Sequence, residues 1–78
     1  MKFRRLDVVV LERDLPVHGL KKGDLGAVVE LYEPDGVEVE FVRVSGETQA
    51  LLTLTVGDIR KIGYRDMLVA RELAEVQT

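Results

Sequence analysis

The residues of this sequence best suited to chemistry lie in the stretch Asp14 to Leu31, which reads DLPVHGLKKGDLGAVVEL and holds the only histidine. His18 could act as a general base if Asp14 or Asp24 oriented its imidazole, but a base also needs a nucleophile and a substrate pocket. The sequence places no nucleophile beside it, because Ser45 belongs to an expected turn. We therefore interpret His18 as a turn residue whose imidazole bonds a nearby backbone group. We predict a protein that is not an enzyme and has no catalytic residue.

The composition limits the cofactors and the location of the protein. There is no cysteine, which excludes disulfides, thiolate metal sites and cysteine nucleophiles, and a single histidine argues against an all-protein zinc site. We therefore expect no metal and no cofactor. No apolar run approaches the roughly 20 residues that span a bilayer, and MKFRRLD lacks the apolar stretch of a secretory signal. These features predict a soluble, cytoplasmic protein with no membrane partner.

The distribution of charge is more informative than the net charge of −3. Residues 1–5 carry three bases and no acid, whereas residues 28–47 carry six acids against Arg43 alone. Such an acidic surface repels nucleic acid, which proteins bind through clustered lysine and arginine, and it attracts a basic partner. The adjacent pair Lys21 and Lys22 is interpreted as solvated, with contact to phosphate as the alternative.

Hydrophobic patterning predicts five short strands, tight turns and one long loop. The third strand is the clearest, because Val37, Val39 and Phe41 alternate with Glu38 and Glu40. The three apolar side chains should face inward and the two glutamates should face water. The expected strands cover residues 6–11, 25–32, 37–41, 48–54 and 60–62, with a loop over 12–24 and one turn of 3₁₀ helix over 55–59.

Finer details of the strands and turns are also predicted. The second strand should carry residues 27, 29 and 31 on one face and residues 28, 30 and 32 on the other. The sequence Glu33-Pro34-Asp35-Gly36 predicts a turn in which the glycine takes a positive φ. We expect a bulge or the end of the third strand near Val42, where the apolar pattern inverts, and a second tight turn at Ser45-Gly46-Glu47.

These elements favour an all-β fold, a small closed or nearly closed barrel. Gly63 marks the end of this unit, so we expect residues 1–63 to form the barrel and residues 64–78 a helical tail. The tail is rich in strong helix formers, and a helix over residues 65–75 is predicted. It could pack on the barrel or dock on another chain, and the second alternative would allow a homo-oligomer.

The run LDVVVLERDLPVHGLKKGDLGAVVELYEPDGVEVEFV, continued by ALLTL and DIRKI, resembles a family of small bacterial proteins classed as a domain of unknown function. The resemblance covers about residues 5–62. It implies a five-stranded SH3-like barrel and no settled activity. A small accessory or antidote protein encoded beside its partner is one setting for such a domain.

The shorter stretch KKGDLGAVVEL is similar to the KOW motif of ribosomal and transcription-elongation proteins, whose barrels often touch RNA. That similarity would make Lys21 and Lys22 phosphate contacts, helped by the bases Arg4, Arg5, Arg60 and Lys61. However, the two glycines of the stretch are needed wherever a backbone turns sharply into a strand. Aromatic residues that could stack on bases are also scarce.

Our preferred interpretation is therefore a non-catalytic module that binds another protein through the long loop and the acidic hairpin. The alternative is a KOW-like barrel that contacts RNA or DNA. The candidate interaction surface comprises Val17, His18, Lys21, Lys22, Glu30, Tyr32, Glu38 and Glu40.

Overall fold

The computed structural model describes residues 1–43 and 45–66 and contains all five expected strands. In chain order the elements are β1 (Val8–Leu11), η1 (Pro16–His18), β2 (Leu25–Tyr32), β3 (Gly36–Val42), β4 (Thr48–Thr55), η2 (Val56–Asp58) and β5 (Ile59–Lys61). Strand β1 begins later than predicted, because Leu6 has a φ of 73° and cannot continue an extended strand. The 3₁₀ turn η2 lies where the sequence predicts one.

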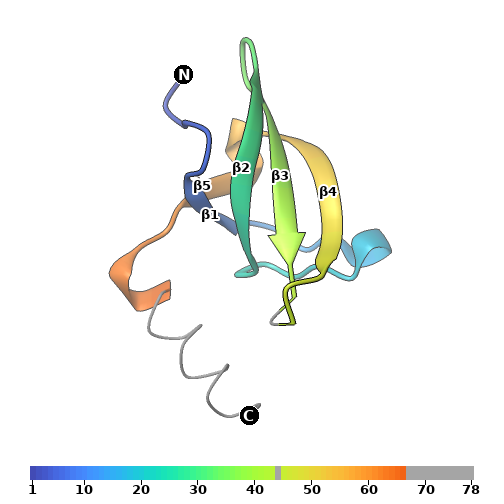
Figure 1. Cartoon of the computed structure of the whole chain (residues 1–78). Coiled ribbons are helices and arrows are strands. Elements are labelled where there is room, and N and C mark those ends of the chain that lie inside the picture. The colour runs from blue at the N-terminus through green and yellow to red at the C-terminus, as the bar shows by residue number, and fades with distance from the viewer. Residues whose placement is uncertain (44, 67–78) are drawn as a thin grey trace.

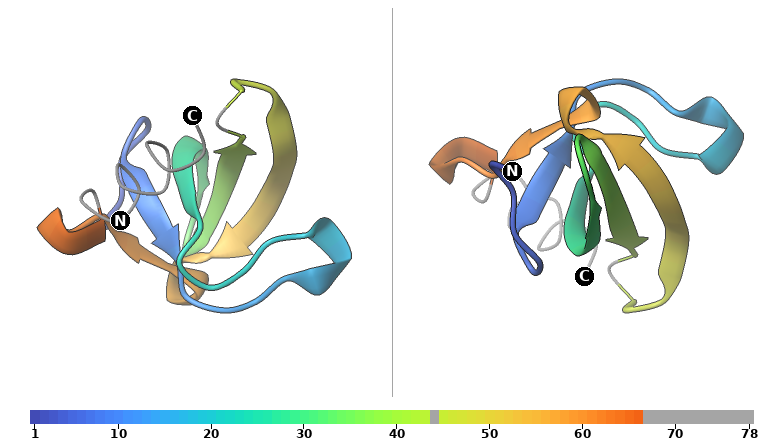
Figure 2. Two further views of the ribbon diagram at one scale, coloured as in Figure 1. Left: turned by 90° about the horizontal axis from the view of Figure 1, so that it is seen from below. Right: turned by 90° about the horizontal axis from the view of Figure 1, so that it is seen from above.

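The strands form one antiparallel sheet in the order β4-β3-β2-β1-β5 (Figure 1). Seen end-on, the sheet curls strongly, and the loop between β1 and β2 projects beyond β4 (Figure 2). The prediction of an all-β fold is confirmed at the level of five antiparallel strands in one sheet. Strands β4 and β5 are the two ends of its hydrogen-bonded order.

The core lies on the concave side of the curl and follows the alternation of β3. Val37, Val39 and Phe41 are at most 1% exposed, as predicted from their spacing. Leu11 from β1 and Leu20 from the β1–β2 loop belong to the same buried cluster. Burial of side chains from strands and from the loop holds the loop against the sheet.

The predicted faces of β2 are wrong beyond Val28. Gly26 and Val28 are buried, and in a regular strand Leu31 would lie on the opposite face from them. The register with β3 shifts after Val28, so Leu31 packs against the core instead. A bulge at Val29 supplies the extra residue that reverses the alternation. Gly26 itself is essential here, because a Cβ atom at this position would lie 2.6 Å from a methyl carbon of Val39.

The turns agree with the sequence in place but not always in conformation. Gly36 does not take the predicted positive φ. Instead it lies against Tyr32, whose Cβ would be 3.2 Å from a Cβ at position 36, and the preceding Glu33–Pro34 peptide is cis. The second turn follows the prediction, with Gly46 at a φ of 92°. Strand β3 ends at Val42, which is one of the two expected alternatives, and the extra residue at the register shift is Gln49 on β4.

The chain turns into helical backbone at residues 64–66, directly after Gly63. The remainder of the helix predicted over 65–75, and both alternatives for its packing, lie outside the described residues. The division into a barrel over 1–63 and a tail over 64–78 therefore stays a prediction.

Candidate interaction surface

The β1–β2 loop, residues 12–24, folds back on itself as a small lobe. The backbones of Leu15 and Leu20 bond each other in both directions, with N···O distances of 2.9 and 3.1 Å. Between them η1 begins at Pro16, a favoured first helical residue, and ends at Gly19, whose φ of 69° is left-handed. Proline and glycine thus shape a tight reversal of the chain, as the sequence suggested.

Two carboxylates of the loop are occupied by its own backbone. Asp14 Oδ1 accepts the amide of Lys22 at 2.8 Å, and Asp24 Oδ2 accepts the amide of Lys21 at 2.9 Å. Neither carboxylate orients His18, and the predicted bond from its imidazole to the backbone is not among the hydrogen bonds of the described residues. The groups that could have assembled a general base hold the loop in shape instead.

The tip of the loop projects into solvent while its base is buried. Val17 is 92% exposed, and His18, Lys21 and Lys22 are also exposed. In contrast, Leu20 is only 2% exposed. A shallow hollow of about 330 Å³ is lined by Asp14, Pro16, Gly19, Leu20 and Lys21. The loop is therefore held to the core at Leu20 and projects into solvent at Val17, with two exposed lysines.

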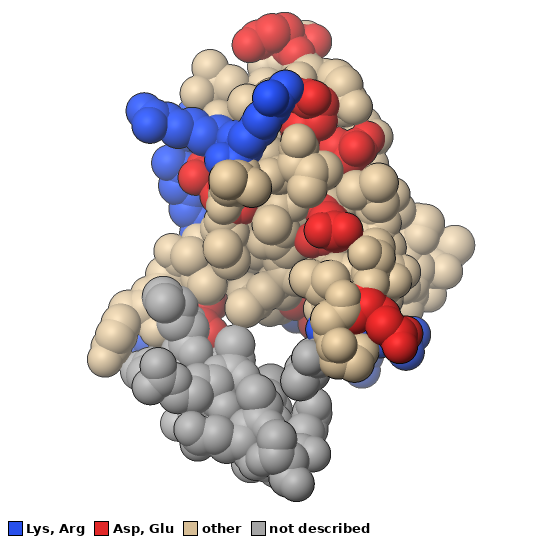
Figure 3. All heavy atoms as spheres, viewed as in Figure 1, with Lys and Arg blue, Asp and Glu red and all other residues tan. Residues whose placement is uncertain are grey.

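The second part of the predicted surface is the outer side of β2 and β3, which we call the acidic face (Glu30, Tyr32, Glu38 and Glu40). Carboxylates gather over these two strands in Figure 3. The hydroxyl of Tyr32 donates to Glu38 Oε1 at 3.2 Å, and Thr48 Oγ1 donates to Glu40 Oε2 at 2.9 Å. In the described part of the chain, no lysine or arginine forms an ion pair with Glu38 or Glu40. Both glutamates are thus oriented by hydroxyls and not by a cation of the described residues.

The remaining members of the acidic face have perturbed pKa values. Glu30 is paired with the guanidinium of Arg5, whose Nη2 lies 2.7 Å from Oε1. The amide of Leu31 and then this guanidinium lower the pKa of Glu30. Partial burial of the ring and then the bond to Glu38 raise the pKa of the Tyr32 phenol. Arg5 of the basic N-terminal segment therefore pairs with one end of the acidic face, and no cation of the described residues pairs with the other end.

The predicted surface residues lie on two separate parts of the fold. Val17, His18, Lys21 and Lys22 lie on the loop, and Glu30, Tyr32, Glu38 and Glu40 lie on the acidic face. The η1 end of the loop lies beyond β4 (Figures 1 and 2), and the side chain of Gln49 on β4 donates to the carbonyl of Gly19 at 3.0 Å. The tip of the loop and the acidic face are therefore on opposite sides of β4.

Comparison with known families now places the chain. The model of a domain of unknown function, DUF4926, matches residues 5–61, which is most of the chain. The chain belongs to the DUF4926 family. No curated protein and no solved structure matches it.

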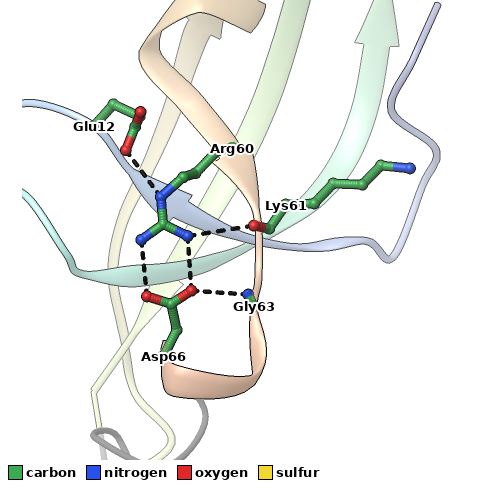
Figure 4. Close-up of polar contacts among 5 residues, drawn as sticks. All are labelled: Glu12, Arg60, Lys61, Gly63 and Asp66. Carbon is green, nitrogen blue, oxygen red and sulfur yellow. Dashed lines mark hydrogen bonds and ion pairs between the residues drawn. The ribbon is translucent and has the colours of Figure 1, made fainter.

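The DUF4926 domain carries a further polar cluster at its end, centred on Arg60 of β5 (Figure 4). The guanidinium donates to Glu12 Oε1 at 3.0 Å and makes two parallel bonds with Asp66, at 2.7 and 2.8 Å. The amide of Gly63 donates to the same carboxylate at 2.8 Å. Arg60, and then Gly63, lower the pKa of Asp66 to about 2. This cluster ties the residues that follow the DUF4926 match to the sheet.

Sequence reasoning missed this cluster and one other. Glu12 is 48 residues from Arg60, and Asp66 follows Arg60 by six residues with no local motif that connects the two. The second is a capping box, in which Asp58 Oδ2 accepts the amide of Thr55 at 2.9 Å and Arg13 donates to Oδ1 at 2.7 Å. Here a signal existed, because a threonine followed three residues later by an acid is typical of this motif.

Residues 1–43 and 45–66 contain neither a candidate metal site nor a membrane-spanning helix. Within this range no group of three or more His, Cys, Asp or Glu side chains is placed to hold a metal ion. Nor does this part of the DUF4926 chain contain a helix that is long and apolar enough to cross a membrane.

Proposed function

We propose that this DUF4926 domain is a non-catalytic protein-interaction module, an accessory or antidote-type partner of another protein, acting in the cytoplasm. The observation that carries the proposal is that Glu38 and Glu40 are hydrogen-bonded but have no ion-pair partner among the described residues. Their carboxylates are oriented by neighbouring hydroxyls but are not neutralised by any cation of the described chain. Oriented, uncompensated acids on a sheet surface suit recognition of a basic protein surface.

The distribution of the cations favours this proposal over nucleic-acid binding. Arg5 and Arg60, two of the bases suggested for phosphate contact, are engaged by carboxylates at 2.7 Å. Lys61 lies 4.0 Å from Asp7. Phosphate binding needs several free cations on one surface, and these three are already partly neutralised. Lys21 and Lys22 have exposed side chains and keep a KOW-like contact to RNA or DNA as the second candidate.

We also propose that the curled sheet is an SH3-like barrel. In support of this, β1 pairs with both β2 and β5, and Val9 and Leu11 of β1 join the three buried residues of β3 in one core cluster. A small barrel filled by side chains leaves no internal chamber for a substrate, which agrees with a binding role.

The proposal is tested by affinity purification of the native chain at low and moderate salt, followed by identification of stoichiometric partners. We expect one basic protein whose affinity falls in Glu38→Gln/Glu40→Gln and is unchanged in Glu33→Gln, a matched change outside the acidic face. Recovery of RNA or DNA with the chain, lost in Lys21→Ala/Lys22→Ala, would replace the proposal by the second candidate. Retention of an equal set of proteins by the double glutamine variant would remove the acidic face from the proposal.

A further inference from the structure

Strand β4 is a long edge strand without the usual protection. Its sequence, TQALLTLT, contains no charged residue, no proline and no glycine. Within the described residues it pairs only with β3. Exposed sheet edges normally carry charges, prolines or bulges that prevent pairing with other chains. β4 has a bulge and the Gln49 contact with Gly19 only at its beginning, so the portion from Leu51 onward has neither.

The hydrogen bonds at the end of β4 establish which of its backbone groups are free. The amide of Thr55 donates to Asp58, on the side away from β3, whereas the amide of Val56 donates to Asp35 in the β2–β3 turn. Because the direction of backbone groups alternates along a strand, Leu51 and Thr53 must point their amides and carbonyls in the same direction as Thr55. Each offers one donor and one acceptor at the open edge.

The side chains beside this edge indicate the chemistry of what could pair with it. Leu51 lies opposite Glu40 and Thr53 opposite Glu38 in the β3–β4 register, and Leu51 is 54% exposed. Glu40 leans toward β4, since its carboxylate is bonded to Thr48, whereas Glu38 is bonded to Tyr32 on the other side. A strand added to β4 would lie about 9.6 Å from β3, two strand spacings. That distance is within the combined length of a glutamate and an arginine side chain.

We infer that β4 accepts a β-strand of a partner protein whose outward side chains are basic, which pairs with the backbones of Leu51 and Thr53 and places a cation at Glu40. This inference rests on the proposed function and names the surface and the partner chemistry for it. Strand addition derives its affinity from main-chain hydrogen bonds and its specificity from alternate side chains. Because β4 pairs with β3 and contacts Gly19 of the loop through Gln49, a strand added to it would lie near both the acidic face and the tip of the loop.

The test begins with selection of binders to the intact chain from a random twelve-residue peptide library. We expect enrichment of sequences in which lysine or arginine alternates with β-branched residues, and shifts of the Leu51 and Thr53 amide signals on binding. Replacing alternate peptide amides by N-methyl groups should weaken binding at least about tenfold, because several backbone bonds are lost. Enrichment of acidic or proline-rich sequences, no enrichment, or equal binding of the N-methylated peptide would overturn the inference.

Variants of the chain give a second readout. Thr53→Pro removes an outward amide and leaves the ladder with β3 intact, so it should abolish peptide binding, whereas Thr53→Val should not. Glu40→Gln should weaken binding about two- to fivefold, and Glu38→Gln should have less effect, because its carboxylate leans away. If Thr53→Pro unfolds the chain, the loss of binding by the N-methylated peptide remains the test of pairing with β4. A free chain that is already dimeric with its Leu51 and Thr53 amides protected would overturn the inference in favour of a second copy.

The failure of this inference can be distinguished from failure of the proposed function. A partner recovered from native lysate that binds Thr53→Pro and Thr53→Val equally would leave the interaction module in place and overturn pairing with β4. Recovery of nucleic acid in place of a protein would overturn both.

Discussion

The sharpest structural prediction concerns Gly26, because a single methyl group there should collide with the opposite strand. In Gly26→Ala the new Cβ would lie 2.6 Å from Val39 Cγ1, 3.0 Å from the carbonyl oxygen of Glu40 and 3.0 Å from Phe41 Cδ1. Ordinary contacts between carbon atoms are about 3.5–4.0 Å. Val39 and Phe41 are at most 1% exposed, so neither side chain can swing into solvent, and the carbonyl belongs to the backbone of a paired strand.

The size of the effect follows from two opposing terms. Overpacking a core costs about 1–3 kcal/mol, and the upper end applies where none of the three atoms can move freely. Replacing glycine by alanine also restricts the unfolded chain, which returns up to about 1 kcal/mol. The free energy of unfolding should therefore fall by about 2 kcal/mol. For a domain of this size, that lowers Tm by about 8–16 °C.

Gly57→Ala is the matched control, because it makes the same chemical change in open space. The nearest atom to a Cβ at position 57 is Thr55 Oγ1 at 3.8 Å, an ordinary contact, and the φ of Gly57 is not positive. Only the unfolded-state term applies there, so this variant should be unchanged or slightly more stable. Urea denaturation followed by circular dichroism measures both variants. A Gly26→Ala protein as stable as Gly57→Ala would refute the assigned pairing of β2 with β3.

Three further predictions test the core, the end of the domain and the acidic face. Phe41→Ala should lower the free energy of unfolding by about 3–5 kcal/mol in urea denaturation, and an unchanged midpoint would mean that its side chain does not fill the core. The pKa of Asp66 is lowered to about 2, so its contact with Arg60 is fully present above the ordinary carboxylate pKa and is lost as the pH falls through about 2. The amide signal of Gly63 should therefore titrate with a midpoint near pH 2, and a midpoint near 4 would contradict the pairing. The Tyr32 phenol has a raised pKa, which Glu38→Gln should shift back down in an alkaline absorbance titration, and no shift would exclude the hydroxyl–carboxylate bond.

The elements of the fold could be predicted from the sequence because most of them depend on local patterns. In β3 each apolar residue is separated by a glutamate, so the inward face is unambiguous. In β2 the run Ala27-Val28-Val29 contains no polar residue to mark the side that faces water. Nothing local therefore revealed the bulge that reverses the faces of this strand. The bulge depends on how β2 pairs with β3, and the sequence of β2 alone does not contain that information.

The candidate surface was predicted in its residue types but not in its arrangement. Exposed lysines and glutamates follow from charge and turn chemistry; Lys21 and Lys22 are exposed, whereas Glu38 and Glu40 are half-buried. The loop is held by burial of Leu20 in the core and by a contact between Gly19 and Gln49, which are 30 residues apart in the chain. The same holds for Arg60, whose partner Glu12 is 48 residues away. Long-range contacts of this kind leave no periodic signal in the sequence.

The pairing of β1 with β5 has a consequence for protein engineering. Val9 lies opposite Lys61, so the first and last strands of the sheet are immediate neighbours. An artificial linker that leaves the buried side chain of Phe3 in the core could therefore join the segments that flank these two strands, and new ends could be opened at the exposed turn around Gly46. The domain could also be inserted into a surface loop of a carrier protein without stretching either junction.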